Sequence, residues 1–167
     1  FDVKEGEIFG IAGVAGNGQS ELMNLLTGEG IDGVSGSLIY NSIDIKNFNP
    51  KKRRDMSIAF VPENRLGHSA VPELTLSENI LISQFPNNNF ITNGMINYRN
   101  INAQAKKVID EFNVVTPGID AKASSLSGGN LQKFVIGREI LTNPKLLIIS
   151  HPTWGIDAGA EHSIRKS

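Results

Sequence analysis

The sequence contains no cysteine, a single tryptophan and no long apolar run among its 167 residues. Without cysteine the chain forms no disulfide and no thiolate metal site, so a reducing compartment is permitted. Its apolar runs fall far short of the roughly 18 residues that a membrane span requires, and no signal peptide is visible. The net charge of -1 gives no general attraction to nucleic acid, which is therefore not an expected partner. The length predicts one domain, or a domain with a small subdomain.

A glycine-rich segment, Gly13 to Ser20, stands between an apolar run and a helical pattern. Residues 8–12 predict a buried strand, and residues 21–26 carry helical spacing. This is the context of a phosphate cradle, because glycines can turn successive N–H groups toward an anion and the helix adds its positive end. The spacing G-x-x-G-x-G does not fit the dinucleotide fingerprint. For this loop alone, a tight strand-to-helix turn without a ligand is an equal alternative.

The next part of the chain predicts two strands and a short helix. Residues 37–40 favour a strand, followed by a loop as far as Asn49. Asn49 and Pro50 are a good cap and first helical position, so the basic run 51–54 starts a helix. For that run a solvated helix face is favoured over a phosphate site. Residues 57–61 predict a strand whose polar loop, 62–67, leaves its carboxyl end, where an α/β sheet places ligand contacts.

Two helices then interrupt the alternation of strand and helix. Residues 75–78 form a capping box that opens a helix through Phe85, and residues 86–97 read as a loop. A second amphipathic helix follows, and both are assigned to a helical subdomain. Its apolar face comprises Ile101, Ala105, Val108, Ile109 and Phe112.

A second anion-binding motif precedes the last strand. Ser127 is a good N-cap, and the two glycines that follow it leave the first amides of the next helix open to an anion. That helix carries a broad apolar face: Leu131, Phe134, Val135, Ile140 and Leu141. Residues 146–149 are continuously apolar, as expected of a parallel strand buried on both faces, and they run into a turn that ends at Asp157.

In order and spacing, these motifs resemble the nucleotide-binding domain of ATP-binding cassette (ABC) proteins. The segment from Leu126 to Asn130 looks like the family signature, and the resemblance covers essentially the whole chain. Residues 10–22 with the loop 61–67 look like the second, degenerate cassette of bacterial importers for simple sugars and nucleosides. Gln at position 19 favours the nucleoside branch.

Four positions depart from the family's pattern. Gln19 replaces the lysine that pairs with the phosphates, and Ser150 replaces the Walker B aspartate that holds Mg²⁺. His151 replaces the catalytic glutamate, and Glu63 replaces the Q-loop glutamine. The resemblance therefore implies weak ATP binding, weak or absent Mg²⁺ binding with Ser20 as a weak ligand, and hydrolysis close to background.

The resemblance transfers three sets of site residues. The nucleotide-binding set is Gly13, Gly16, Asn17, Gly18, Gln19, Ser20 and Glu21. The signature set, which would face the ATP of a partner cassette, is Leu126, Ser127, Gly128, Gly129 and Asn130, and Asp157 is the D-loop aspartate. Trp154, in the same turn, is either an interface residue or a ring packed under the loop.

The expected fold is α/β, a P-loop NTPase with a RecA-like parallel sheet core and an inserted helical subdomain. Residues 1–73 and 126–167 would form the core and residues 74–125 the subdomain. The chain starts at Phe1 rather than methionine and stops in a charged stretch at Ser167, so we expect truncation at both ends. The adenine-stacking aromatic residue and the switch histidine of the family would then lie outside it.

The resemblance implies an importer ATP-binding domain, peripheral on the cytoplasmic face of the cell membrane. Its partners would be a second cassette, fused on the N-terminal side, and transmembrane permease subunits. One alternative is a structural cassette that binds no nucleotide and only completes the partner's site. The other is a competent non-transport ATPase that uses His151 as its base, since imidazole titrates near neutrality.

Overall fold

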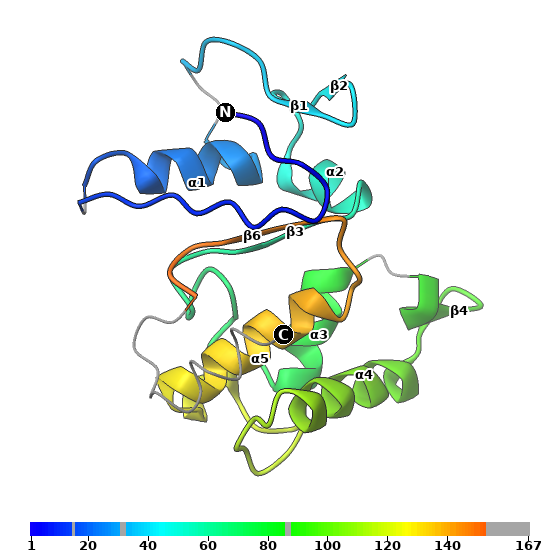
Figure 1. The fold of residues 1–167 in the computed structure, drawn as a ribbon. Helices are drawn as coiled ribbons and strands as arrows, with labels where there is room; N and C mark the ends of the chain where they lie inside the picture. Colours follow the sequence, from blue (N-terminus) through cyan, green and yellow to red (C-terminus); the bar gives the residue numbers. More distant parts are fainter. Residues whose placement is uncertain (15, 31–32, 86–87, 153–167) are drawn as a thin grey trace. The chain divides into compact units, whose positions relative to one another are not determined.

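The computed structural model describes residues 1–14, 16–30, 33–85 and 88–152 (Figure 1). Two compact units divide the chain, Phe1–Lys52 and Arg53–Ser167. The helices are α1 (Gln19–Thr27), α2 (Pro50–Asp55), α3 (Leu76–Gln84), α4 (Tyr98–Glu111) and α5 (Gly128–Ile140). The strands are β1 (Ile39–Tyr40), β2 (Ile43–Asp44), β3 (Ile58–Val61), β4 (Ile91–Thr92), β5 (Met95–Ile96) and β6 (Leu146–Ile149), and the 3₁₀ helices are η1 (Asn88–Phe90) and η2 (Ala123–Ser125).

Helix α1 lies in the first unit and begins and ends at glycines. Gly18 precedes it and Gly28 follows it, each in the left-handed conformation that glycine adopts without steric cost. The N–H of Gly28 donates to the carbonyl of Asn24, which satisfies an acceptor of the last turn. The predicted helix after the glycine loop is confirmed.

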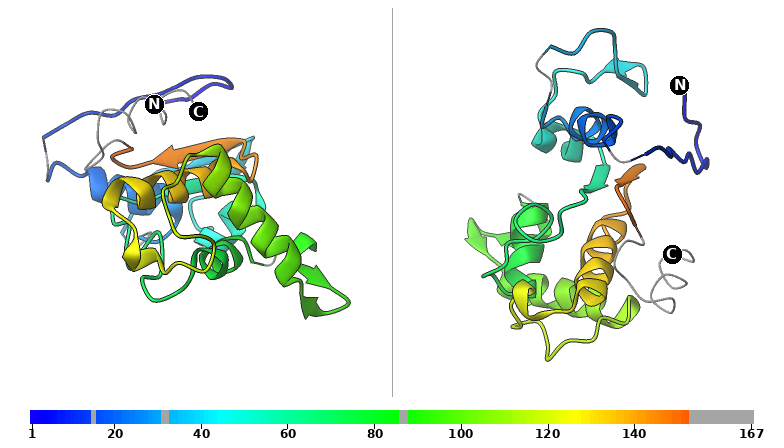
Figure 2. Two further views of the ribbon diagram at one scale, coloured as in Figure 1. Left: turned by 90° about the horizontal axis from the view of Figure 1, so that it is seen from below. Right: turned by 90° about the vertical axis from the view of Figure 1, so that its left-hand side faces the viewer.

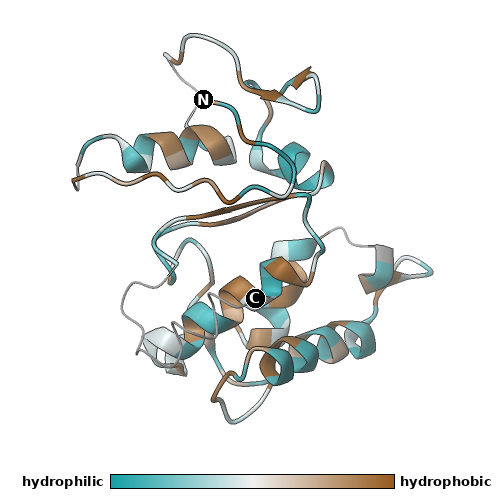
Figure 3. Cartoon of the chain, viewed as in Figure 1, coloured by the Kyte–Doolittle hydropathy of each residue, from teal (hydrophilic) through white to brown (hydrophobic). Residues whose placement is uncertain are grey.

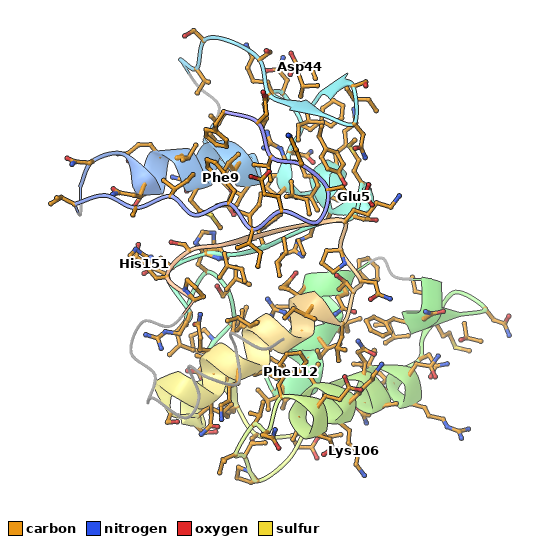
Figure 4. The ribbon with its side chains drawn as sticks, in the orientation of Figure 1. Glu5, Phe9, Asp44, Lys106, Phe112 and His151 are labelled. Atoms are coloured by element: carbon orange, nitrogen blue, oxygen red, sulfur yellow. The ribbon has the colours of Figure 1, made fainter. Side chains whose placement is uncertain are left out.

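The predicted strand at residues 8–12 is wrong in this structure. Among the described residues no strand precedes Ile39, and the side chain of Ile8 is 100% exposed. Phe9, labelled in Figure 4, stacks on Phe1 with 4.8 Å between the ring centroids. A strand exists only where a neighbouring strand accepts and donates its ladder hydrogen bonds. The apolar run therefore predicted an extended backbone and could not supply the partner.

Two short antiparallel hairpins are present: β1 lies within the predicted strand 37–40, whereas β2, β4 and β5 lie in predicted loops. The residues between β1 and β2, Asn41 and Ser42, both have positive φ. The same holds for Asn93 and Gly94 between β4 and β5. A type I′ hairpin turn has positive φ at both positions and matches strand twist, and Asn-Gly is a sequence that strongly favours it.

The second unit is built around the parallel pair β3–β6. Val61 pairs with Ile149 at the carboxyl end of the ladder. Helices α3, α4 and α5 lie on one side of this pair (Figures 1 and 2), and Figure 3 shows both strands as hydrophobic. All of β3 is buried, whereas β6 is only half-buried, so the prediction that β6 is buried on both faces is wrong for the described chain.

The helices bury the faces that their spacing predicted. Ile101, Ala105 and Val108 of α4 are at most 1% exposed, and they join one core with α3 and α5. The capping box of α3 is complete, because Thr75 accepts from the N–H of Glu78 and the Glu78 carboxylate accepts from the N–H of Thr75. Along the described residues, no helix combines the length and the apolar character of a membrane span.

Helix α2 is present, but only part of its basic run is a solvated face. Asn49 caps the helix, since its Oδ1 accepts from the N–H of Lys52 at 2.9 Å. Arg53 is completely buried, and Arg54 forms an ion pair with Glu139 of α5. Lys51 and Lys52 are exposed, whereas Arg53 is buried and the Arg54 side chain is 27% exposed, so the prediction holds for the lysines and is wrong for Arg53.

Candidate functional site

The loop before α1 is shaped by two glycines. Gly16 and Gly18 have φ of 86° and 96°, and the N–H of Asn17 donates to the carbonyl of Val14 at 3.2 Å. Gly18 supplies no side-chain cap to the first turn of α1. A helix start without a side-chain cap is the arrangement that anion sites use, because its N–H groups and the helix dipole favour negative charge.

The side chain of Gln19 folds back over this loop. Its Nε2 donates to the carbonyl of Val14 at 3.0 Å, and its Oε1 accepts from the N–H of Asn17 at 3.1 Å. A methyl group added to Gly13 would lie 2.6 Å from Nε2, so the amide packs against the backbone there. Ser20, the next residue along α1, is exposed. Of the predicted nucleotide-binding residues, Gln19 is thus in contact with Gly13 and Asn17.

The carboxyl ends of β3 and β6 bring three predicted residues to one edge. The N–H of Ser150 donates to the carbonyl of Val61 at 2.9 Å, which extends the ladder by one bond. Ser150 and His151 therefore leave β6 beside the point where Glu63 leaves β3, and Figure 4 labels His151 at this edge. This edge is where open α/β sheets place ligand contacts.

His151 and Glu63 face each other at this edge. His151 Nε2 lies 4.0 Å from Glu63 Oε2, with side chains 53% and 40% exposed. His151 also has a φ of 48°, which is uncommon for a residue with a side chain. The edge therefore presents an imidazole, a hydroxyl and one carboxylate. Among the described residues, no group of three His, Cys, Asp or Glu side chains could hold a metal ion.

The signature segment forms the start of α5. Ser127 is its N-cap, and its hydroxyl oxygen accepts from the N–H of Asn130 at 3.4 Å and from the Asn130 side-chain amide at 3.0 Å. The Oδ1 of Asn130 accepts in turn from the N–H of Val115 at 2.8 Å. The predicted cap is confirmed, and Asn130 connects the motif to the chain that follows α4.

One residue that sequence reasoning missed contacts the signature directly. The Nη1 of Arg65, in the loop after β3, donates to the carbonyl of Gly128 at 3.0 Å. The buried side chain of Gln132, one turn further along α5, donates to the carbonyl of Pro152 at 3.4 Å. The chain around the β3–β6 edge is thus bonded to α5 at two places. Trp154 and Asp157, both singled out from the sequence, lie outside the described residues.

The sequence profile of a known family, described as ABC transporter, matches residues 1–154. The chain belongs to the ABC transporter family. It has the α/β P-loop NTPase fold of ABC cassettes, as two solved structures show. One is a dimeric ATP-binding cassette in a post-hydrolysis state bound to ADP and Pi, with a TM-score of 0.78, 25% identity, and coverage of 99% of this chain and 69% of that one. The other is a nucleotide-free cassette from an ABC transporter, with a TM-score of 0.65, 25% identity, and coverage of 91% and 60%.

Curated relatives of this ABC cassette include import proteins. Nucleoside import ATP-binding protein NupA of Lactococcus lactis is 44% identical over 99% of this chain and 33% of its own length. Guanosine import ATP-binding protein NupO of Bacillus subtilis is 41% identical over 99% of this chain and 32% of its own length. Xylose import ATP-binding protein XylG of Moorella thermoacetica is 34% identical over 98% of this chain and 32% of its own length. The chain spans about a third of the length of these relatives.

The ABC cassette also holds a buried charge cluster, formed by Arg54, Arg138 and Glu139. The carboxylate of Glu139 is fully buried and lies 2.6 Å from Nη1 of Arg54 and 2.9 Å from Nη2 of Arg138. Burial lowers the pKa of Arg138, and the charge of Glu139 acts in the opposite direction. Arg54 also stacks over Phe60 at 4.1 Å from the ring centroid. The adjacent charged residues Arg138 and Glu139 interrupt the apolar pattern of α5, and this was the signal in the sequence for the cluster.

Proposed function

We propose that this chain is the ATP-binding domain of an importer for nucleosides or simple sugars, with a degenerate site of its own. In this assignment the loop Gly13–Glu21 binds the phosphates of ATP, with Ser20 as a weak Mg²⁺ ligand. Glu63 occupies the Q-loop position, and Ser150 and His151 occupy the positions of the metal-binding aspartate and the catalytic glutamate. The import relatives support the transported class. Nucleosides are favoured because NupA and NupO, which are 44% and 41% identical to this chain, carry nucleoside or guanosine in their names.

The observation that carries the degenerate site is the composition of the β3–β6 edge. The bond from Ser150 to Val61 makes Ser150 and His151 the residues that leave β6 there, and Glu63 is the carboxylate facing them. Mg²⁺ prefers carboxylate and phosphate oxygens in octahedral geometry, so a serine hydroxyl and an imidazole are a poor set for it. The uncapped start of α1 suits a phosphate, so these residues fit the nucleotide better than they fit the metal.

The substitutions at this site should affect ATP binding less than ATP hydrolysis. Loss of one charge-assisted lysine contact costs roughly 1.5–3 kcal/mol, which is about ten- to a hundredfold in affinity. Loss of a placed general base costs about 10²–10⁴ in rate before any loss of metal positioning is counted. ATP binding should therefore weaken, while hydrolysis at this site should fall close to background.

The signature would serve the ATP bound by a partner cassette. The hydroxyl of Ser127 and the N–H groups at the start of α5 would stabilise charge on that nucleotide. The partner would be a second cassette fused on the N-terminal side, and permease subunits would dock near Glu63 and the helical subdomain. Residues 1–73 and 126–167 would form the nucleotide-binding core, residues 74–125 the helical subdomain, and Asp157 the D-loop. The domain would act at the cytoplasmic face of the cell membrane.

The test of this assignment is ATP turnover by the full-length protein assembled with its partners. Ser127→Arg should stop turnover at the partner's site and leave ATP binding to each cassette nearly unchanged, because the arginine blocks only the interface. Ser124→Arg, at a neighbouring exposed serine, is the matched control and should retain turnover. Normal turnover with Ser127→Arg in a stably folded protein would overturn the proposal and leave the signature as a helix cap.

A structural cassette that binds no nucleotide is the second candidate, and the two bonds of Gln19 favour it. One of them occupies the N–H of Asn17, a donor that a phosphate would use, and the other holds the amide on the Val14 carbonyl. Calorimetry with Mg·ATP on the full-length protein, with the partner site disabled, separates the two candidates. Restoring Gln19→Lys, Ser150→Asp and His151→Glu together should strengthen that binding by at least about 1.5 kcal/mol if the backbone cradle is intact.

A competent ATPase that uses His151 as its base is favoured by one observation, the carboxylate of Glu63 4.0 Å from the ring. A carboxylate can orient an imidazole for proton transfer. His151→Ala, measured with the partner site disabled, decides this candidate. Turnover at background in both the parent and the variant would exclude it.

A further inference from the structure

The side chain of Gln19 makes two hydrogen bonds of opposite polarity to the loop that precedes it. Its Nε2 donates to Val14 O at 3.0 Å, and its Oε1 accepts from Asn17 N at 3.1 Å. A primary amide is the neutral group that donates and accepts at once. A lysine would offer donors only and could not accept from Asn17, and a glutamate would accept only and could not donate to Val14.

The position of the amide is fixed by contact as well as by these bonds. Gly13 lies so close that an added Cβ would be 2.6 Å from Nε2, a separation that real Cβ atoms essentially never show. The side chain is half-buried, although the loop around it is exposed. The loop is therefore closed on itself by a group that belongs to the first residue of α1.

This closure uses a donor that a phosphate needs. Backbone N–H groups of such a loop are what bind an anion, and the N–H of Asn17 already donates to the Gln19 oxygen as well as to the Val14 carbonyl. An incoming phosphate must displace that oxygen and leave the Val14 carbonyl without its side-chain donor. Loss of that donor costs free energy unless water replaces it.

We propose that Gln19 occupies its own phosphate loop and competes with nucleotide phosphate for the N–H of Asn17. The inference rests on the proposed function, because it treats this loop as a phosphate site. Gln19 then lowers phosphate affinity by two routes: it lacks the charge of a lysine, and it holds the loop in a closed, self-bonded form. Removing the side chain should therefore improve phosphate binding, whereas removing an ordinary ligand would weaken it.

The experiment compares Gln19→Ala, Gln19→Lys and Gln19→Glu in the full-length protein, with Gln104→Ala of α4 as the matched control. Hydrogen exchange at the Asn17 amide is measured without nucleotide, by mass spectrometry at single-residue resolution. Inorganic pyrophosphate is then titrated by calorimetry. Gln19→Ala should speed exchange at Asn17 by about fivefold and tighten pyrophosphate binding by about the same factor, which corresponds to one net hydrogen bond.

Gln19→Lys should speed the same exchange and bind pyrophosphate more tightly than Gln19→Ala, because it adds a cation and removes the Gln19 oxygen from the Asn17 N–H. Gln19→Glu should keep exchange slow and abolish binding through charge repulsion. Gln104→Ala should change neither measurement.

Two results would overturn the closure. One is hydrogen exchange at the Asn17 amide that is unchanged in Gln19→Ala. The other is weaker pyrophosphate binding by that variant, which would make Gln19 a phosphate ligand. Faster exchange with no binding by any variant, Gln19→Lys included, would support the closure and overturn the phosphate site of the proposed function instead.

Discussion

Arg65 donates a hydrogen bond of 3.0 Å from its Nη1 to the carbonyl oxygen of Gly128. The bond joins the loop that follows β3 to the first residue of α5, at the signature segment. The carbonyl of Gly128 and the cap of Ser127 lie on consecutive residues, so the start of α5 is held by a side chain from outside the motif as well as by its own cap.

Arg65→Ala should loosen the start of α5. Loss of this exposed, charge-assisted bond should lower the free energy of unfolding by about 1 kcal/mol and speed hydrogen exchange in the first turn of α5. Urea unfolding and exchange mass spectrometry measure the two effects. Arg99→Ala, at an exposed position of α4, is the control and should change neither. Identical exchange at the start of α5 in the parent and Arg65→Ala would show that the bond contributes nothing.

Gly137→Ala should destabilise the packing of α4 on α5. A methyl group at Gly137 would lie 2.5 Å from the ring of Phe112, which follows α4 and is labelled in Figure 4. Alanine improves helix propensity by about 1 kcal/mol, but overpacking typically costs about 1–3 kcal/mol, so the net effect should be a loss. The melting temperature should fall.

Gly10→Ala is the control for that substitution, since nothing lies within 4 Å of a methyl group there. A second variant, Gly137→Ala with Phe112→Leu, should recover part of the loss because the smaller side chain leaves room. A melting temperature for Gly137→Ala equal to that of the parent would contradict the tight contact.

Glu139→Gln should be strongly destabilising because it removes the negative charge of the buried charge cluster. Arg138 is 3% exposed and Glu139 is fully buried, so the variant would leave a buried guanidinium without its counter-charge. Breaking such a pair from one side costs about 3–5 kcal/mol. Urea unfolding measures the loss.

Glu111→Gln is the matched control, because Glu111 forms an exposed pair with Lys107 at 3.7 Å on one face of α4. Its loss should cost at most about 0.5 kcal/mol. Equal stability of Glu139→Gln and Glu111→Gln would contradict the importance of the buried charge cluster.

Glu78 makes the free energy of unfolding depend on pH in the acidic range. The hydrogen bonds from the backbone and side chain of Thr75 hold the pKa of Glu78 below its ordinary value of 4.5. A lowered folded-state pKa stabilises the fold at neutral pH, and this contribution is lost as the pH falls through the folded-state pKa. Glu78→Gln should therefore be less stable than the parent at pH 7, and the difference should shrink below pH 4.5. A difference independent of pH would contradict the assignment.

Local features of the chain were predictable from the sequence because their causes are local. The capping box of Thr75 and Glu78, the Ser127 cap and the end of α1 at Gly28 each depend on residues within a few positions. The apolar faces of α4 and α5 follow from helical spacing. The Asn93–Gly94 hairpin was predictable on the same grounds, and reading the asparagine-rich segment as a loop overlooked its turn signal.

What the tertiary structure decided depends on groups far apart in the chain. Residues 8–12 carry the composition of a strand, but a ladder needs a neighbour that no local pattern specifies. The basic residue Arg54 reads as a surface charge until Glu139, brought to it by the packing of α5, provides the buried partner. His151 and Glu63 face each other only because β3 and β6 are parallel and in register. Spacing and composition predict short-range hydrogen bonds and the buried faces of helices. Strand pairing and buried ion pairs join distant residues, so they are determined only when the chain has folded.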